Sequence, residues 1–418
     1  MYKFYFDESY HDRKIIIKES GINTFAANLS DSYVGFFWGA KENIIDEIFE
    51  KYLEIEEKYK KILGIEKEFK ATTFSLKNFR FGIKSFNKDC FNFYLDFFDL
   101  MDRNDIVIQY DIISKIEFLI VRVFDLNLQR NRKVIESFKI SVQLFIYSLS
   151  KFMKVYYNDE LIKALYEVEN FETAKEFKEL LIKQLSTICQ TIKGIERKER
   201  EYFAFNQLIA IISLLKIDIS IEKQFKFSYI PNLEGFTALL RERNIKSKFV
   251  DLYIDEEEST FNVAKNYRFY KVTSLNSKEN IGIRIADILS NFVGRFIYAI
   301  RNDKNILEDP VIRLEDLNKN DLSTKRLLSD DWFDVSEEQF KIYYKAAKVF
   351  AINHQYYWTL LTGHYYDDAI MFIELMKFFY YNRNYKSFTK HPLGLRKEYF
   401  NSQVIRMLEH NYTKYSSN

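Results

Sequence analysis

Cysteine, proline and glycine are all scarce in this chain of 418 residues, which has 2 Cys, 3 Pro and 11 Gly. Cys90 and Cys189 form no Cys-x-x-Cys motif and have no histidine cluster beside them, which argues against a thiolate zinc site and a disulfide scaffold. So few cysteines fit a reducing compartment, and we expect a cytoplasmic protein. The glycines form neither a phosphate-binding loop nor a dinucleotide fingerprint, so a kinase, an ATPase or a dehydrogenase is not expected.

The chain also lacks a strong charge of either sign and a long hydrophobic run. Lys and Arg number 62 against 60 Asp and Glu, so no overall field draws the protein to nucleic acid, and any such binding must be local. No apolar stretch has the length that crosses a bilayer. The N-terminus opens on the strand-like segment Tyr2 to Phe6, so we expect neither a signal peptide nor a membrane partner.

Aromatic residues, by contrast, are abundant, with 40 Phe and 30 Tyr. We interpret most of them as core side chains, because large rings supply much of the area that a core buries. The aromatic residues Phe372, Phe379, Tyr380 and Tyr381 have two interpretations. They form either an exposed face for a homo-oligomer or a protein partner, or a face buried within the C-terminal tail.

The first third of the chain and a later stretch have the pattern of an α/β fold. Apolar residues at helical spacing predict a helix over 44–63, and further helices are expected over 91–101 and 281–300. Runs rich in β-branched and aromatic residues predict the strands. These strands cover 2–6, 14–18, 23–38, 105–113, 223–230, 248–254 and 268–274.

A block with almost no strand signal interrupts this α/β pattern. Candidate helices fill it at 116–128, 134–156, 159–190 and 199–217. Strand signals then resume, so we interpret the block as an insertion. The predicted parts are the first part of an α/β core (1–125), a helical insertion (126–222), the second part of the core (223–302) and a helical, aromatic-rich C-terminal subdomain (303–418).

Three short acidic segments stand out because each follows or interrupts an apolar run. Asp7 ends the first strand, within Tyr-Phe-Asp-Glu-Ser, and Asp255 ends the strand Tyr-Ile-Asp. Each has a simpler interpretation, a turn for Asp7 and a solvated acidic loop or helix cap for Asp255. Asp287 lies inside Ile-Ala-Asp-Ile-Leu on a mostly apolar helix, where a buried acid needs a cation, an arginine or donor groups. Arg284, three residues earlier, is one candidate partner.

Glu68 belongs to a fourth segment, Glu-Lys-Glu-Phe-Lys-Ala, which by itself is an ordinary charged surface segment. Taken in order, however, the four segments resemble the motifs of the domain of unknown function 3800 family. The resemblance covers roughly residues 1–125 and 223–302. It implies a ribonuclease H-like mixed sheet, here with a large helical insertion and a helical C-terminal subdomain, and a metal-dependent nuclease site.

The resemblance makes Asp7, Glu68, Asp255 and Asp287 the candidate catalytic and metal-ligating residues, with Glu8 in a supporting role. Lys70 matches a basic position of the family and is a candidate phosphate contact. Two residues depart from the family pattern: Tyr10 stands where a Gly often follows Asp-Glu-Ser, and Arg284 stands where a Gln is common. Asp111, near the end of the strand over 105–113, is a rival for the place of Asp255.

Clustered carboxylates repel one another, and oxygen ligands favour Mg²⁺ or Mn²⁺. With the nuclease activity that the resemblance implies, we expect a two-metal hydrolysis of phosphodiester bonds in RNA or DNA. Apart from Lys70, the candidate nucleic-acid contacts are the basic residues that precede Asp255 in the chain. They are Arg241, Arg243, Lys246 and Lys248.

The resemblance also suggests a setting in bacterial anti-phage defence. A different class of function remains open, a non-catalytic ribonuclease H-like scaffold that binds a protein partner through its helical regions. Metal-dependent cleavage of labelled RNA or DNA distinguishes the two hypotheses.

Overall fold

The computed structural model describes residues 1–9, 17–18, 21–22, 32–156, 158–216, 230–256, 258–304, 328–352 and 367–416. Tyr10, one of the two departures from the family pattern, lies outside these residues, as do most of the strand predicted over 223–230 and parts of those predicted over 14–18 and 23–38. No helix in these ranges is both long enough and apolar enough for a membrane span.

A mixed sheet of five strands organises the molecule. Its strands are β1 (Tyr2–Ser9), β4 (Ser32–Lys41), β6 (Val107–Ser114), β7 (Val250–Asp255) and β8 (Lys271–Leu275). They lie in the order β6-β4-β1-β7-β8. β4 runs antiparallel to both β1 and β6, whereas β7 runs parallel to both β1 and β8. Among the strands that the structure describes, the short β2 (Ile17–Lys18) and β3 (Gly21–Ile22) pair with each other and not with this sheet. The chain is therefore an α/β protein, as the sequence predicts.

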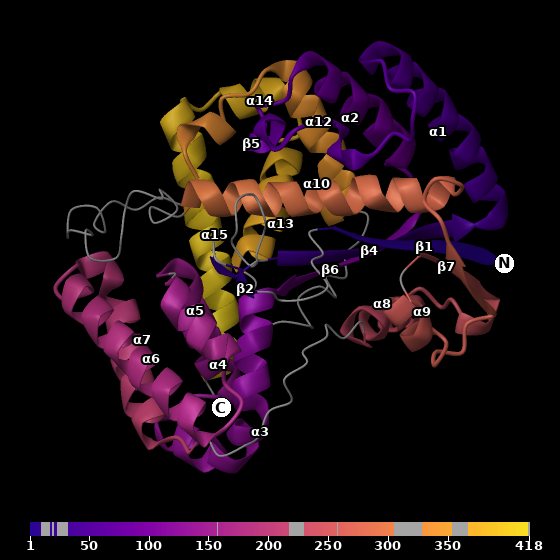
Figure 1. Cartoon of the computed structure of the whole chain (residues 1–418). Coiled ribbons are helices and arrows are strands. Elements are labelled where there is room, and N and C mark those ends of the chain that lie inside the picture. Colours follow the sequence, from indigo (N-terminus) through magenta and orange to yellow (C-terminus); the bar gives the residue numbers. More distant parts are fainter. Residues whose placement is uncertain are drawn as a thin grey trace.

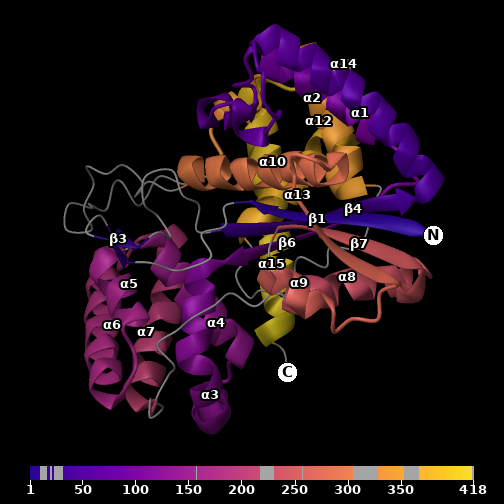
Figure 2. The same ribbon diagram turned by 45° about the vertical axis from the view of Figure 1, so that its right-hand side comes forward.

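The two faces of the sheet bury different cores. On β1, Tyr5 packs into one hydrophobic core, and its neighbours Phe4 and Phe6 pack into the other, as the alternation of side chains along a strand requires. The long helix α10 (Ile281–Lys304) lies across the first face. The second face is covered by α8 (Ile230–Glu242) and the start of α3 (Lys115–Ser137) (Figures 1 and 2).

Two helices near the N-terminus pack over α10. Helix α1 (Glu42–Leu63) buries the stripe Ile45, Ile48, Tyr52, Glu56 and Tyr59, and it ends where Gly64 adopts a left-handed conformation (φ 66°). Helix α2 (Lys88–Met101) packs beside it. Both agree with the helices expected over 44–63 and 91–101.

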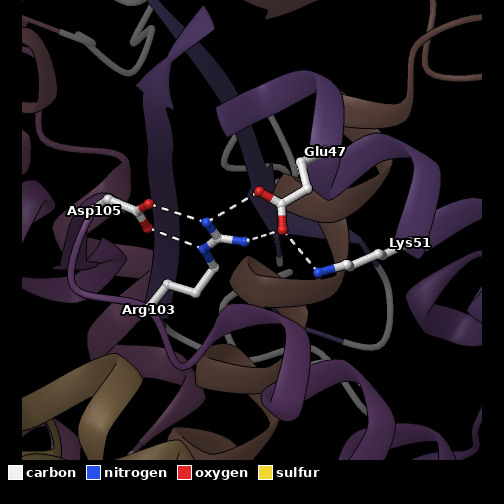
Figure 3. Close-up of polar contacts among 4 residues, drawn as sticks. All are labelled: Glu47, Lys51, Arg103 and Asp105. Atoms are coloured by element: carbon white, nitrogen blue, oxygen red, sulfur yellow. Dashed lines mark hydrogen bonds and ion pairs between the residues drawn. The ribbon is translucent and has the colours of Figure 1, made fainter. Parts of the chain in front are cut away.

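An ion network at the surface ties α1 to the turn that follows α2. The Arg103 guanidinium donates to Glu47 (Nη1 to Oε1, 2.9 Å) and to Asp105 (Nε to Oδ1, 3.0 Å), and Lys51 donates to Glu47 (2.7 Å) (Figure 3). The hydrogen bonds from Arg103 and Lys51 lower the pKa of Glu47 to about 2. The two-sided contact of Arg103 fixes the start of β6 relative to α1.

The expected helical block is present, but two of its helices are shorter than the pattern predicts. The helix expected over 134–156 is interrupted: α3 ends at Ser137, Lys139 adopts a positive φ of 59°, and Ser141 caps the next helix. A capping box at Asn170 likewise divides the helix expected over 159–190. The helices that follow α3 are α4 (Val142–Val155), α5 (Asp159–Tyr166), α6 (Phe171–Ile192) and α7 (Glu199–Leu214).

Ile230, predicted to end a strand, instead begins helix α8. Helix α9 (Glu258–Ala264) follows β7. The short helical turns of the described chain are η1 (Ala71–Thr73), η2 (Leu76–Phe79), η3 (Glu196–Lys198), η4 (Ser247–Phe249), η7 (Asp330–Trp332) and the π-helical η8 (Lys348–Ile352). The small strand β5 (Arg80–Ile83) continues directly from η2.

The C-terminal helices share the core of the first sheet face. They are α12 (Glu337–Ala347), α13 (Asp367–Tyr381), α14 (Tyr385–Thr389) and α15 (Leu393–Ser416). Phe372 and Phe379 are fully buried in the hydrophobic core that also contains the apolar residues of α10, whereas Tyr381 is exposed. Burial is therefore the correct interpretation for these two phenylalanines.

Candidate active site

Asp7 and Asp255 lie side by side near the C-terminal ends of two neighbouring strands of the sheet. β1 and β7 are parallel, and their last paired residues are Phe6 and Ile254. The next residue on each strand is the aspartate. Tyr5 and Tyr253, two residues earlier, stack on each other with ring centroids 5.0 Å apart. Because side chains alternate along a strand, both aspartates share the sheet face of these tyrosines, which is the face that α10 covers.

Asp7 is 8% exposed, and its Oδ1 accepts the backbone N–H of Glu8 at 2.7 Å. Burial raises the pKa of Asp7 well above its ordinary value, and the negative charges of Asp287, Glu8 and Asp255 raise it further. Burial is also the main cause that raises the pKa of Asp255, although that carboxylate accepts backbone N–H groups from Glu256 and Ser277. The two neighbouring carboxylates therefore repel each other when both are ionised.

Asp287, on α10, lies at the same end of the sheet. Asn280 caps the helix by accepting the N–H of Ile283 (3.1 Å), and Gly282 allows a close approach to β1, since a Cβ there would meet the Tyr5 ring at 2.3 Å. Farther along, the Ser9 hydroxyl donates to the Ser290 carbonyl (2.8 Å). The helix is therefore held against the end of β1 on both sides of Asp287.

The Asp287 carboxylate has two donors. Asn291 Nδ2 donates to Oδ1 (2.7 Å), and the backbone N–H of Ala71 donates to Oδ2 (3.1 Å). Burial nevertheless raises the pKa of Asp287, because it outweighs the lowering effect of the Ala71 hydrogen bond and of the Lys70 charge. These contacts fix the orientation of the carboxylate without neutralising it.

Arg284 does not pair with Asp287 in this structure. Its Nη2 lies 2.9 Å from Glu56 Oε2 of α1, in an ion pair whose two side chains are both largely buried, and Nη1 donates to the carbonyls of Ser277 and Lys278. The simpler interpretation of Asp287, an intrahelical pair with Arg284, is thus wrong. Glu56 is not among the residues that the sequence predicts for the site, although its spacing from Tyr52 and Tyr59 places it on the buried stripe of α1.

Glu68 and Lys70 enter the site from the loop between α1 and η1. The Glu68 side chain is 11% exposed, and its Oε2 lies 3.6 Å from Lys70 Nζ. Within the described chain that buried oxygen accepts no hydrogen bond. The charge of Glu68 raises the pKa of Asp287, while Lys70 acts in the opposite direction on both Asp287 and Asp255. The four acids expected from the sequence therefore belong to one electrostatic cluster around Lys70.

Asp111, the rival of Asp255, lies on the other face of the sheet. It is fully buried and accepts hydrogen bonds from Gln109 (3.1 Å) and from Asn232 of α8 (3.2 Å). Burial raises its pKa to about 8 despite these two donors. Because α8 and α10 cover opposite faces, Asp111 is separated by the sheet from Asp7 and Asp287.

Glu8 also has its side chain on the face opposite Asp7, because it is the adjacent residue on β1. In the register of the sheet it is aligned through Gly35 with Asp111. Glu8 acts on the cluster through the backbone N–H that Asp7 accepts and through its negative charge, which raises the pKa of Asp7. A supporting role for Glu8 would use that amide or that charge.

The predicted nucleic-acid contacts at Arg241, Arg243, Lys246 and Lys248 lie at the opposite end of the sheet from the acids. They occupy the connection between α8 and the start of β7, and Arg243 lines a cavity of about 410 Å³ together with Tyr2. Tyr2 and Asp7 are five residues apart on β1, a separation of about 17 Å. The expectation that nearness in the chain places these residues beside the carboxylates is therefore wrong.

The donor set suits a hard divalent cation, since carboxylate oxygens are the ligands of Mg²⁺ and Mn²⁺. Mutual repulsion and the buried Glu68 Oε2 both favour positive charge at this place. As the side chains lie, however, no group of three His, Cys, Asp or Glu residues in the described ranges is arranged to hold one ion. Cation binding would require the carboxylates to rotate toward one another.

Known proteins add no assignment to this geometry. No protein-family model matches the chain, and comparisons with curated proteins and with solved structures find no match either. The chemistry of the cluster has to be inferred from its own side chains and from the sheet that carries them.

Proposed function

We propose that the protein is a nuclease that uses Mg²⁺ or Mn²⁺ to hydrolyse phosphodiester bonds in RNA or DNA. One observation carries this proposal: Asp7 and Asp255, on neighbouring parallel strands, and Asp287, from the helix that crosses them, lie close enough for the charges of the other two to raise the pKa of Asp7. Burying mutually repelling acids costs stability, and a divalent cation offsets that cost.

The topology of the sheet supports a ribonuclease H-like fold. In that fold the first strand is central. The second strand, antiparallel to the first, and the third, antiparallel to the second, lie on one side, and two later strands parallel to the first lie on the other. Here β1 has β4 and β6 on one side and β7 and β8 on the other, with the corresponding directions. The acids lie where β1 and β7 end, an edge at which open α/β sheets commonly bind ligands.

Within this proposal each residue has a defined task. Asp7, Asp255, Asp287 and Glu68 hold the cations, which when bound activate water and stabilise the leaving oxygen. Asn291 and the Ala71 N–H orient Asp287, as partners of ligating carboxylates commonly do. Lys70, exposed beside the acids, binds a nonbridging phosphate oxygen of the substrate.

Cleavage assays with matched variants test the proposal. Labelled RNA and DNA are incubated with purified protein, with Mg²⁺, with Mn²⁺ or with a chelator. We expect metal-dependent cleavage that is lost in Asp7→Asn and in Asp287→Asn. Asp111→Asn is the control, because it removes a buried acid from the other face of the sheet.

Cleavage that persists in both Asp7→Asn and Asp287→Asn would exclude the site, and a selective loss in Asp111→Asn would move it to the other face. All variants are purified identically and compared by thermal unfolding, so that a contaminating nuclease or a misfolded variant is recognised.

A further inference from the structure

Helix α10 has one accessible stripe that continues beyond the carboxylates. Most of its described side chains are buried, but Asp287, Asn291, Tyr298 and Asn302 are partly or fully exposed. Their spacing of four, seven and four residues places them on one side of the helix. A polar track therefore extends from Asp287 toward the C-terminal end of α10.

The segment that follows Lys70 forms the second wall of this track. It runs alongside α10 in the same direction: Ala71 bonds to Asp287, and the Phe74 carbonyl accepts from Arg295 Nη1 at 2.6 Å. Phe79 then packs on Phe296, with ring centroids 6.0 Å apart. Arg295 is only 4% exposed, so its hydrogen bond joins the two walls in the interior rather than at the surface.

Beyond Arg295 the two walls enclose a cavity of about 510 Å³. Lys77, Arg80 and Phe81 line it from the segment, and Tyr298 and Asn302 line it from α10. Two acids, Asp303 and Asp331, also line it. Asp303 Oδ2 already accepts hydrogen bonds from the Ser329 N–H (2.6 Å) and from the Trp332 indole (3.0 Å). These two bonds attach Asp303 to the segment around η7.

The polar side chains of the cavity are otherwise uncommitted. Lys77 and Arg80 are exposed and form no ion pair with any residue that the structure describes. Arg80 lies over the ring of Phe81, 5.0 Å from its centroid. Within the same part of the chain, Tyr298 and Asn302 make no side-chain hydrogen bond or ring contact. Within the described residues, two cations without an ion pair, one aromatic ring and one amide thus face one cavity.

This combination matches the chemistry of nucleotides, which present phosphates to cations and flat bases to aromatic rings. Bases are free to stack on a protein only when they are unpaired, so the ligand is a single strand. Asp287 and Tyr298 are eleven residues apart on α10, or about 17 Å. At the spacing of stacked nucleotides, about 3.4 Å, this distance spans about five nucleotides.

We propose that the cavity and the polar track that leads to it from Asp287, together called the groove, bind single-stranded nucleic acid on one side of the carboxylates, with Lys77 and Arg80 on its phosphates and Tyr298 stacked on a base. The inference rests on the proposed nuclease function, because it names the substrate class of that site. The proposal assigns the phosphate contacts to Lys77 and Arg80 in place of the basic residues between α8 and β7, which lie at the opposite end of the sheet from the acids.

Binding is measured without cleavage, by fluorescence anisotropy of labelled oligonucleotides in the presence of a chelator. The probes are a 12-nucleotide single-stranded RNA, the corresponding single-stranded DNA and the DNA duplex. We expect the single strands to bind more tightly than the duplex. The RNA and DNA arms identify which backbone the groove prefers.

In the double variant Lys77→Ala, Arg80→Ala the loss of two phosphate contacts makes the slope of log K against log[salt] shallower by about 1.4. Tyr298→Ala weakens binding roughly 5-fold to 150-fold through lost stacking. Tyr298→Phe keeps the ring and retains the affinity of the original protein. The matched control is Lys183→Ala, Lys193→Ala, which removes two exposed lysines from the distant helical block.

An unchanged salt slope in the Lys77, Arg80 variant, an unchanged affinity in Tyr298→Ala, or the absence of oligonucleotide binding would each overturn the groove. The nuclease function is judged separately by cleavage. If cleavage depends on Asp7 but the groove variants bind normally, the groove fails and the nuclease stands. If no metal supports cleavage but the groove variants lose affinity, the groove stands and the nuclease fails.

Discussion

The Asp287 carboxylate accepts the backbone N–H of Ala71 at 3.1 Å, and this bond joins α10 to a segment 216 residues earlier in the chain. Ala71 directly follows Lys70, so the contact sets the position of that lysine relative to the acids. Asn291 holds the other oxygen of Asp287. The orientation of one partly buried carboxylate therefore determines how α10 and the loop after α1 meet at the site.

Removal of the Asn291 side chain leaves Asp287 in place but less well oriented. In Asn291→Ala we expect the affinity for Mn²⁺ to fall by about 10-fold to 100-fold, as is typical when a partner of a metal ligand is removed. Titration calorimetry with Mn²⁺ measures this change. Asn206→Ala is a matched control, because Asn206 makes the same bond to the carbonyl four residues earlier in a helix remote from the acids. Equal Mn²⁺ affinities in the two variants would contradict the role of Asn291.

The raised pKa of Asp7 predicts how stability depends on pH without metal. The folded protein holds a proton on this cluster at pH values where the unfolded chain has lost it, because the unfolded pKa of an aspartate is about 3.9. Stability therefore declines as pH rises from about 4 through the raised pKa. Thermal unfolding between pH 4.5 and 8 with a chelator should show a flatter profile for Asp7→Asn than for the original protein.

Metal addition should reverse this loss. At a Mg²⁺ concentration about 100 times the dissociation constant, binding to the folded state adds about 2.7 kcal/mol. The melting temperature at pH 7.5 should rise by a few degrees for the original protein and remain constant for Asp7→Asn. The same Mg²⁺-induced rise in both proteins would show that the cation binds elsewhere.

Asp111 contributes a separate pH dependence from the other sheet face. Burial raises its pKa to about 8, so the folded state retains this proton between pH 4 and 8 and loses stability as pH rises across that window. Asp111→Asn imitates the protonated acid and should be more stable than the original protein at pH 8, with cleavage unaffected. Chemical denaturation at pH 5 and pH 8 checks the first outcome. A variant that is less stable at pH 8 would show that the ionised carboxylate is the preferred form.

Gly282 controls the distance between α10 and β1. A methyl group there would meet the Tyr5 ring at 2.3 Å, so Gly282→Ala must push the helix away or displace the ring. We expect a loss of about 1–3 kcal/mol in the free energy of unfolding and a weaker metal affinity, because Asp287 moves with the helix. The control is Gly394→Ala in α15, where a Cβ meets no atom within 4 Å and helix propensity improves. Comparable stability losses in both variants would refute this account.

The sequence predicts the sheet and the acids of the cluster better than their surroundings. Asp7, Asp255 and Asp287 could be identified because each acid follows or interrupts an apolar run, which is a local pattern. The partner of Arg284 could not, because the choice between Asp287 on the same helix and Glu56 on α1 depends on how two helices pack. The basic residues before β7 do not lie beside the acids for a related reason. β7 crosses the whole sheet, so residues before its first residue are distant from Asp255 at its last.

Helix ends show the same limit. Apolar periodicity continues through Lys139 and Asn170, where a left-handed residue and a capping box end one helix and begin another. The division of the chain into four parts remains a prediction. The helices of the tail nevertheless contribute to the same hydrophobic core as α1 and α10.

The pairing of β1 with β7 has a consequence for synthesis of the protein. Tyr2 pairs with Val250, so the first strand emerges from the ribosome long before its parallel neighbour exists. At a translation rate of about 5–20 residues per second, β1 waits on the order of ten seconds or more for this partner. The carboxylate cluster cannot assemble until α10, which ends at Lys304, has also been made, so its four acids come together only after most of this sequence has been translated.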